Sequence, residues 1–421
     1  MMGRPLRPPF SSVREDLDMR QKKRIPWKTL LVALPAALVG AVLGYWAMGR
    51  ADAMGGEGLA KAGHLLLILA LAALAYLVQI VVHEGGHLVC GLLTGYRPMF
   101  YRIGWVMVAK VEGRWRLCRY HIPGTGGQCL MAPPERTPVP YRLYNWGGGL
   151  ANLLLAALAL PLFLQAETPP AQAFFGALAL LGIGLAATNL IPMQAGGVGN
   201  DGYNAQNLGK DPAALEQYAC QLRINAALME GRSPSDMPEE WFPLPPADSW
   251  GNPFAATSAM QAAGRRLEQG AVEEAEGIFR ALLDREDLLG LYRLEITCEV
   301  IFCGLLLGRP REELEALNTP ELEKYRRATR PYCLSRSRQD YAWVLLSEGD
   351  RPAAEKARAR FEAAAARSPH PGELAGERRL LALADRTAHF EGNLNPGAVV
   401  SPRRLCYTED GGTPYQTERR Y

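Results

Sequence analysis

The sequence predicts a mainly α-helical protein in which a membrane domain precedes a soluble helical-repeat domain. The membrane domain would have about four transmembrane helices and a small β-hairpin insertion. Two observations support this class. Nearly all long uncharged stretches lie before residue 200, whereas the chain beyond it is rich in Glu, Arg and Ala. With 421 residues, the chain is also long enough for two or three domains.

Four stretches are apolar enough to cross a bilayer, which takes about 20 residues per helix. We expect a basic N-terminal segment, 1–28, followed by a membrane domain, 29–210. Its predicted spans are residues 30–48, 62–82, 148–166 and 171–193. The first apolar run is longer than the core of a signal peptide, so we expect it to be retained.

The distribution of positive charge predicts the orientation. Lysine and arginine are concentrated before the first span and between the second and third spans, whereas the loop Glu167–Pro170 has neither. Because basic loops stay in the cytoplasm, we expect a multi-pass protein of the cell membrane with both termini cytoplasmic. The eight cysteines include no C-x-x-C pair, and the five that lie in the polar half are expected to be free thiols in that reducing compartment. The net charge of +3 gives no indication of nucleic-acid binding.

Residues 99–132, between the second and third spans, are unlike the rest of the membrane half. Phe100–Val111 and Trp115–His121 are rich in aromatic and β-branched residues, and Glu112-Gly113 separates them. This pattern predicts a β-hairpin. A glycine-rich loop and the apolar run Cys129–Ala132 follow, which suggests a small sheet beside the membrane.

Residues 211–390 show a helical, soluble pattern. Helix-turn-helix units are expected to turn at Gly270, Gly308 and Gly349, which are 38 and 41 residues apart. This spacing resembles tetratricopeptide repeats, and a plain helical bundle is the alternative. Residues 391–421 combine Gly, Pro, Thr and charge, which predicts a flexible tail.

The sequence His83-Glu-Gly-Gly-His87 is the strongest functional signal. Positions i and i+4 share one face of a helix, so both imidazoles can bind one metal ion. Glu84 lies beside them, where a carboxylate can take a proton from a water that zinc has acidified to a pKa of about 7. With six histidines in the chain, a chance match is improbable. The alternative is that these residues merely contact lipid head groups at the membrane boundary.

Asp201 is the predicted third ligand. A catalytic zinc takes three protein ligands and keeps one open position. Asp201 is the first acidic residue after Glu167, and it follows the last predicted span on the same side of the bilayer as His83 and His87. The alternative is an ordinary turn aspartate before Gly202.

Three elements, in the same order, resemble the site-2 protease family of intramembrane metalloproteases. The first is the HExxH sequence at His83, Glu84 and His87. The second is Gly148-Gly-Leu-Ala-Asn152, which has glycine where the family has proline. The third is Asn189-Leu-Ile-Pro192 with Asp201-Gly202, in which the stretch 195–200 lengthens the family's spacing. The resemblance covers roughly residues 60–210.

The resemblance implies Zn²⁺ held by His83, His87 and Asp201, with Glu84 as the catalytic base, and a substrate that is itself a transmembrane protein. It also implies substrate-binding roles for Gly126 and Gly127, as part of an edge strand, and for Asn152 and Asn189. From the residues alone, Asn152 could equally form a hydrogen bond between helices.

The predicted activity is hydrolysis of a peptide bond in or next to a transmembrane segment. Two alternatives keep parts of this prediction. One is a non-catalytic membrane scaffold that recruits a cytoplasmic protein through the helical repeats. The other is a membrane-bound zinc protease that acts on soluble substrates.

Overall fold

The computed structural model describes residues 40–42, 44–120, 125–195 and 198–392. The predicted N-terminal segment, most of the first predicted span and nearly all of the predicted tail lie outside these residues. Within them, residues 44–53 are helical and cover the end of that first span. The described chain is mainly helical and forms two compact units.

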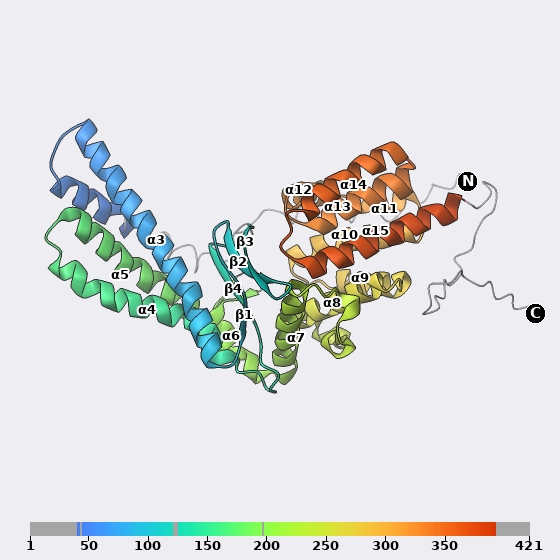
Figure 1. Cartoon of the computed structure of the whole chain (residues 1–421), viewed down its shortest axis with the longest axis horizontal. Helices are drawn as coiled ribbons and strands as arrows, with labels where there is room; N and C mark the ends of the chain where they lie inside the picture. The colour runs from blue at the N-terminus through green and yellow to red at the C-terminus, as the bar shows by residue number, and fades with distance from the viewer. Residues whose placement is uncertain (1–39, 43, 121–124, 196–197, 393–421) are drawn as a thin grey trace, which may run out of the picture. The chain divides into compact units, whose positions relative to one another are not determined.

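The first unit comprises the chain up to His83 together with residues 148–203. It contains the apolar helices α4 (Tyr141–Gln165, from Gly148 on) and α5 (Pro169–Leu190), and most of α3 (Leu59–Leu93). Within the described residues, these three helices are long and apolar enough to cross a membrane. They lie side by side (Figure 1) and pack through small residues such as Ala75, Ala159 and Ala177. Small residues let helix backbones approach closely.

Helix α3 is longer than the predicted span 62–82. It continues without a break through His83 and His87 to Leu93, so the whole HExxH sequence is helical. The boundary between the two units falls inside this helix, directly after His83.

The second unit begins at Glu84 and includes a four-stranded antiparallel sheet. Its strands are β1 (Arg97–Ile103), β2 (Val106–Val111), β3 (Arg114–Arg119) and β4 (Gly127–Ala132), in the order β3-β2-β1-β4. The small sheet expected in 99–132 is present, and β2 and β3 form a hairpin that turns at Glu112-Gly113 as predicted, but the sheet has one strand more than the sequence indicated. The run Phe100–Val111 contains a turn at Gly104, whose φ is +55°, and the apolar run after the loop adds β4 as an edge strand.

A short connection leads from α5 to the soluble helices. It contains the two-residue strands β5 (Gln194–Ala195) and β6 (Val198–Gly199) and then α6 (Asp201–Asn207). After the turn η1 (Leu208–Lys210), α7 (Pro212–Met229) packs against the sheet, where Leu215 and Tyr218 join Phe100, Met107 and Leu130 in one core.

The remaining elements of the second unit are mostly short helices. They are η2 (Pro234–Asp236), η3 (Glu239–Trp241), η4 (Ala247–Gly251), α8 (Pro253–Glu268), α9 (Val272–Leu283), α10 (Gly290–Leu306), α11 (Arg311–Leu317), α12 (Pro320–Thr329), α13 (Leu334–Ala342), η5 (Trp343–Glu348), α14 (Arg351–Ala365) and α15 (Pro371–Gly392). Gly270, Gly308 and Gly349 each follow a helix with a φ of 86°, 63° and 67°, as expected of helix-ending glycines. The seven cysteines within the described residues are free thiols.

Candidate metal centre

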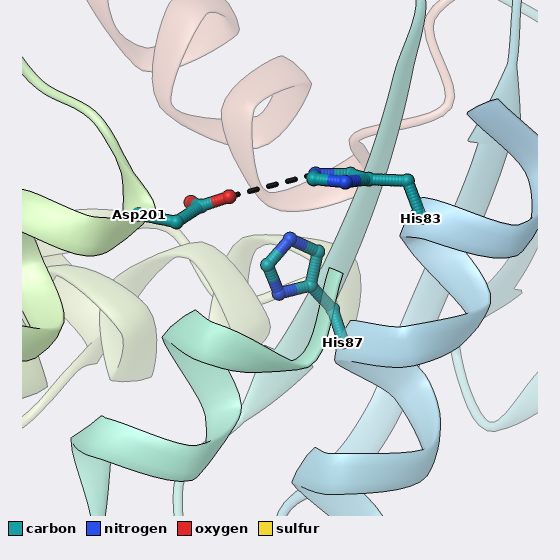
Figure 2. Close-up of side chains that lie close together, drawn as sticks. All are labelled: His83, His87 and Asp201. Atoms are coloured by element: carbon teal, nitrogen blue, oxygen red, sulfur yellow. Dashed lines mark ion pairs between the residues drawn. The ribbon is translucent and has the colours of Figure 1, made fainter. Parts of the chain in front are cut away.

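Helix α3 and the first residue of α6 bring the three predicted ligands together. His83 and His87 project from successive turns of α3, and Asp201 reaches them from α6 (Figure 2). The ligand atoms of the three residues all lie within 4.8 Å of one another. One bound metal ion could therefore contact all three side chains.

The ring of His87 is oriented by a backbone carbonyl. Its Nδ1 lies 2.8 Å from the carbonyl oxygen of Tyr144 in α4. A carbonyl oxygen only accepts hydrogen bonds, so Nδ1 must carry the proton and donate it. The other nitrogen, Nε2, therefore has a lone pair for a metal ion.

The ring of His83 is oriented by Asn152. Its Nδ1 lies 2.7 Å from Oδ1 of Asn152, and the amide nitrogen of Asn152 donates to the backbone oxygen of Gln79 at 2.9 Å. Gln79 and Asn152 are both fully buried. This contact also leaves Nε2 of His83 as the nitrogen that faces Asp201.

The contact between His83 and Asp201 fits a cation site. Nε2 of His83 lies 3.5 Å from Oδ2 of Asp201, which is longer than a good hydrogen bond. A nitrogen lone pair facing a carboxylate is unfavourable unless a metal ion or a second ring proton compensates it. Two imidazole nitrogens and one carboxylate oxygen are also a known donor set for a catalytic metal. The residues present therefore fit a metal ion.

Asp201 is positioned by its two neighbours in the chain. The Oδ1 atom of Asn200 accepts hydrogen bonds from the backbone nitrogens of Met193 and Tyr203, and its Nδ2 donates to the carbonyls of Thr188 and Ile191 at 2.7 Å each. A Cβ at Gly202 would lie 2.2 Å from the carbonyl oxygen of Leu190, so only glycine fits there. The lengthened connection thus folds back on the end of α5 and presents Asp201.

Glu84 is 8% exposed and lies against the first residue of β4. A Cβ at Gly127 would come within 2.7 Å of both Cγ and Oε1 of Glu84. Burial, with a further contribution from the negative charge of Glu84, raises the pKa of Tyr101 in β1 to about 12. The carboxylate is therefore enclosed beside the sheet.

The four predicted substrate-binding residues have different surroundings. The carbonyl of Gly126 accepts a hydrogen bond from the backbone nitrogen of Gly104, and Gly127 opens the edge strand β4. The amide nitrogen of Asn189 donates to the carbonyl of Leu185 in its own helix. Asn152 forms hydrogen bonds with His83 and Gln79, so its observed contacts are those of a residue that orients a metal ligand.

Three residues that position the ligands were missed in the sequence: Gln79, Tyr144 and Asn200. Gln79 had a usable signal, because it is a polar side chain inside an apolar helix and lies four residues before His83. Tyr144 acts through its backbone carbonyl, which every residue type has, so the sequence gives no signal for it. Asn200 follows a glycine-rich stretch that reads as an ordinary loop.

The chain was also compared with known proteins. No protein-family model, curated protein or solved structure matches it. A function for this chain can therefore be proposed only from the residues and geometry described above.

Proposed function

We propose that this protein is a zinc-dependent intramembrane protease of the site-2 protease type. The observation that carries the proposal is the convergence of His83, His87 and Asp201, with the Nδ1 atom of each imidazole engaged by an oxygen acceptor. This arrangement leaves the Nε2 atoms for a metal. In the proposed enzyme the three side chains hold Zn²⁺, and Glu84 is the base.

The proposed chemistry is peptide hydrolysis. Zinc held by these ligands would act as a Lewis acid and acidify a water molecule. Glu84 would accept a proton from the attacking water and later give it to the leaving amine. The close contact with Gly127 restricts where the carboxylate can lie, which favours a base held in one place.

The proposed substrate is a transmembrane segment that is locally extended. Peptide bonds inside a helix are shielded, so a helical substrate must unwind before attack. Strand β4 lies at the edge of the sheet and begins beside Glu84. An extended substrate could pair with this edge by strand addition, with Gly126 and Gly127 nearest the base.

The environment proposed for the apolar helices is the lipid bilayer. Many large apolar side chains of α3 and α4 are exposed, including Leu66, Leu154 and Leu164 at 68%, 64% and 73%. Lipid would cover these side chains. We further propose that the helical domain forms tetratricopeptide-like repeats on the cytoplasmic side and recruits a protein partner there.

The decisive experiment is the Glu84→Gln variant of the full chain, purified in lipid nanodiscs with a transmembrane test substrate. We expect cleavage to fall by about 10² to 10⁴-fold, the usual contribution of a general base, while the zinc content per chain stays unchanged. Glu57→Gln, an exposed residue before α3, is the matched control and should cleave normally. Retained cleavage in Glu84→Gln would refute the mechanism.

The same preparation separates the alternatives. A wild-type chain that binds no zinc and cleaves nothing would favour a membrane scaffold. Cuts mapped outside any apolar segment would favour a protease of soluble or peripheral proteins. Cuts inside an apolar segment are the result expected from an intramembrane protease.

A further inference from the structure

Gln79 is a fully buried polar residue in α3 that the proposed chemistry does not use. It lies four residues before His83, one helical turn away. A buried amide in an apolar helix is costly unless its donors and acceptors are all matched. The partners of Gln79 therefore indicate why an amide is present at this position.

The hydrogen bonds of Gln79 and Asn152 run in one direction. Nε2 of Gln79 donates to the backbone carbonyl of Leu178 in α5 at 2.7 Å. Because that carbonyl can only accept, Oε1 of Gln79 must face Asn152 and accept from its Nδ2 at 2.7 Å. The same Nδ2 group donates to the backbone oxygen of Gln79. Oδ1 of Asn152 is thereby turned toward Nδ1 of His83.

We propose that Gln79 is a positioning residue that sets the tautomer of His83 through Asn152. The inference rests on the proposed zinc site. With Oδ1 of Asn152 fixed as an acceptor, the His83 ring carries its proton on Nδ1 and presents the Nε2 lone pair toward Asp201. A chain of hydrogen bonds thus links α5 to the metal ligand, from the Leu178 carbonyl through Gln79 and Asn152 to His83.

The opposite tautomer is disfavoured by the same contacts. It would need the Asn152 amide to flip so that its nitrogen faced His83. The flip would turn Oδ1 toward the backbone oxygen and Oε1 of Gln79, which are both acceptors. Two buried hydrogen bonds would be lost, and the polar atoms left without partners would destabilise this tautomer.

The space for this contact is provided by Gly182 of α5. A Cβ at that position would lie 2.4 Å from Nε2 of Gln79 and 2.9 Å from the backbone oxygen of Asn152. The absence of a side chain at Gly182 lets the Gln79 amide reach the carbonyl of Leu178.

The test compares three variants of the full chain in nanodiscs. Gln79→Leu removes both side-chain hydrogen bonds. Gln79→Glu keeps them, because a buried carboxylic acid stays neutral, donates its O–H to Leu178 and accepts from Asn152. Gln172→Leu is the matched control. It removes a glutamine in the first turn of α5 that donates to the carbonyl of Ala166 and accepts from the guanidinium of Arg50.

Two measurements are made on each variant: the zinc dissociation constant by chelator competition, and the His83 tautomer in the zinc-free protein by ¹⁵N NMR of labelled histidine. The His83 signals are assigned by their loss in His83→Ala. We expect Gln79→Leu to weaken zinc binding about 10-fold, the low end for a residue behind a ligand, and to mix the tautomers. Gln79→Glu and Gln172→Leu should match the wild type in both measurements.

The outcomes separate this inference from the proposed function. If the wild type binds zinc and Gln79→Leu binds it equally well with an unchanged tautomer, the role of Gln79 is refuted and the protease proposal stands. Equal losses in Gln79→Leu and Gln79→Glu would also refute it. A wild type without zinc affinity would instead refute the proposed function itself.

Discussion

At the scale of single residues, Gly127 allows the sheet to approach the proposed base closely. Gly127→Ala would place a methyl group against Glu84 and displace its side chain. We expect the turnover rate to fall by about 10²-fold, since a shift of about 1 Å at a reacting group can cost that much. Cleavage assays and zinc content would be measured together, and zinc content should not change.

Gly264→Ala is the control for this substitution. Gly264 lies in α8, and outside the neighbouring backbone of that helix no atom lies within 4 Å of the position that an alanine methyl group would take. Alanine at this position should therefore leave cleavage intact. Normal turnover in Gly127→Ala would contradict the close contact with Glu84.

The ligand residues could be predicted from the sequence because their signals are local. The spacing of His83 and His87 on one helix face is sufficient to pair them. Asp201 is a candidate because it follows the last predicted span on the same side of the bilayer as the two histidines. The residues that orient these ligands could not be identified from local sequence patterns. Tyr144 acts through its main chain, and Asn200 bonds backbone atoms whose positions depend on how the connection folds back.

At the scale of elements, periodicity and hydropathy located the apolar helices but not their ends. Helix α3 extends to Leu93 because polar residues that follow an apolar run can continue a helix when they pack. Strands were harder to predict. The turn at Gly104 interrupts a run that reads as one strand, and the pairing of β4 with β1 depends on residues about 30 apart in the chain.

Two ionisable groups with strongly shifted pKa values lie at the start of α15: His370, directly before the helix, and Glu373, in its first turn. His370 meets the rings of Phe100 and Tyr120 edge-on, and burial lowers its pKa to about 4. One turn later, burial, reinforced by the charge of Glu377, raises the pKa of Glu373 to about 7. The folded state therefore holds the proton of Glu373 more tightly than the unfolded state does, and ionising this carboxyl destabilises the fold.

Glu373→Gln should therefore stabilise the protein at high pH. The gain in unfolding free energy should reach up to about 3 kcal/mol at pH 8 and vanish near pH 4.5, where Glu373 is protonated. The variant should lose stability as the pH falls from about 6.5 to 4, because His370 then resists protonation in the folded state. Thermal unfolding of the full chain across this pH range measures both effects.

The control for Glu373 is Glu362→Gln, on the exposed surface of α14 beside Arg378. Its stability difference from the wild type should show no such rise between pH 4.5 and 8. A Glu373→Gln variant with a pH-independent difference would contradict the buried carboxyl.

At the scale of the whole molecule, the charge distribution predicts which residues lie outside the cell. Thr168, exposed at the start of α5, should be extracellular, and Asp248 of the helical domain should be cytoplasmic. In intact cells, a membrane-impermeant maleimide should label Thr168→Cys and leave Asp248→Cys unlabelled until the membrane is permeabilised. Labelling of intact cells only at position 248 would contradict the proposed topology and indicate the opposite orientation.

The missing side chain at Gly182 has a consequence for how α3 and α5 can align. Neighbouring residues of a helix are displaced by about 1.5 Å along its axis. Sliding α5 by one residue would take the Leu178 carbonyl away from Gln79 and bring the side chain of Leu181 or Ile183 toward the gap. The two helices therefore fit together at one axial position. A shift away from it would break the hydrogen bonds through Gln79 and Asn152 that orient the imidazole of His83.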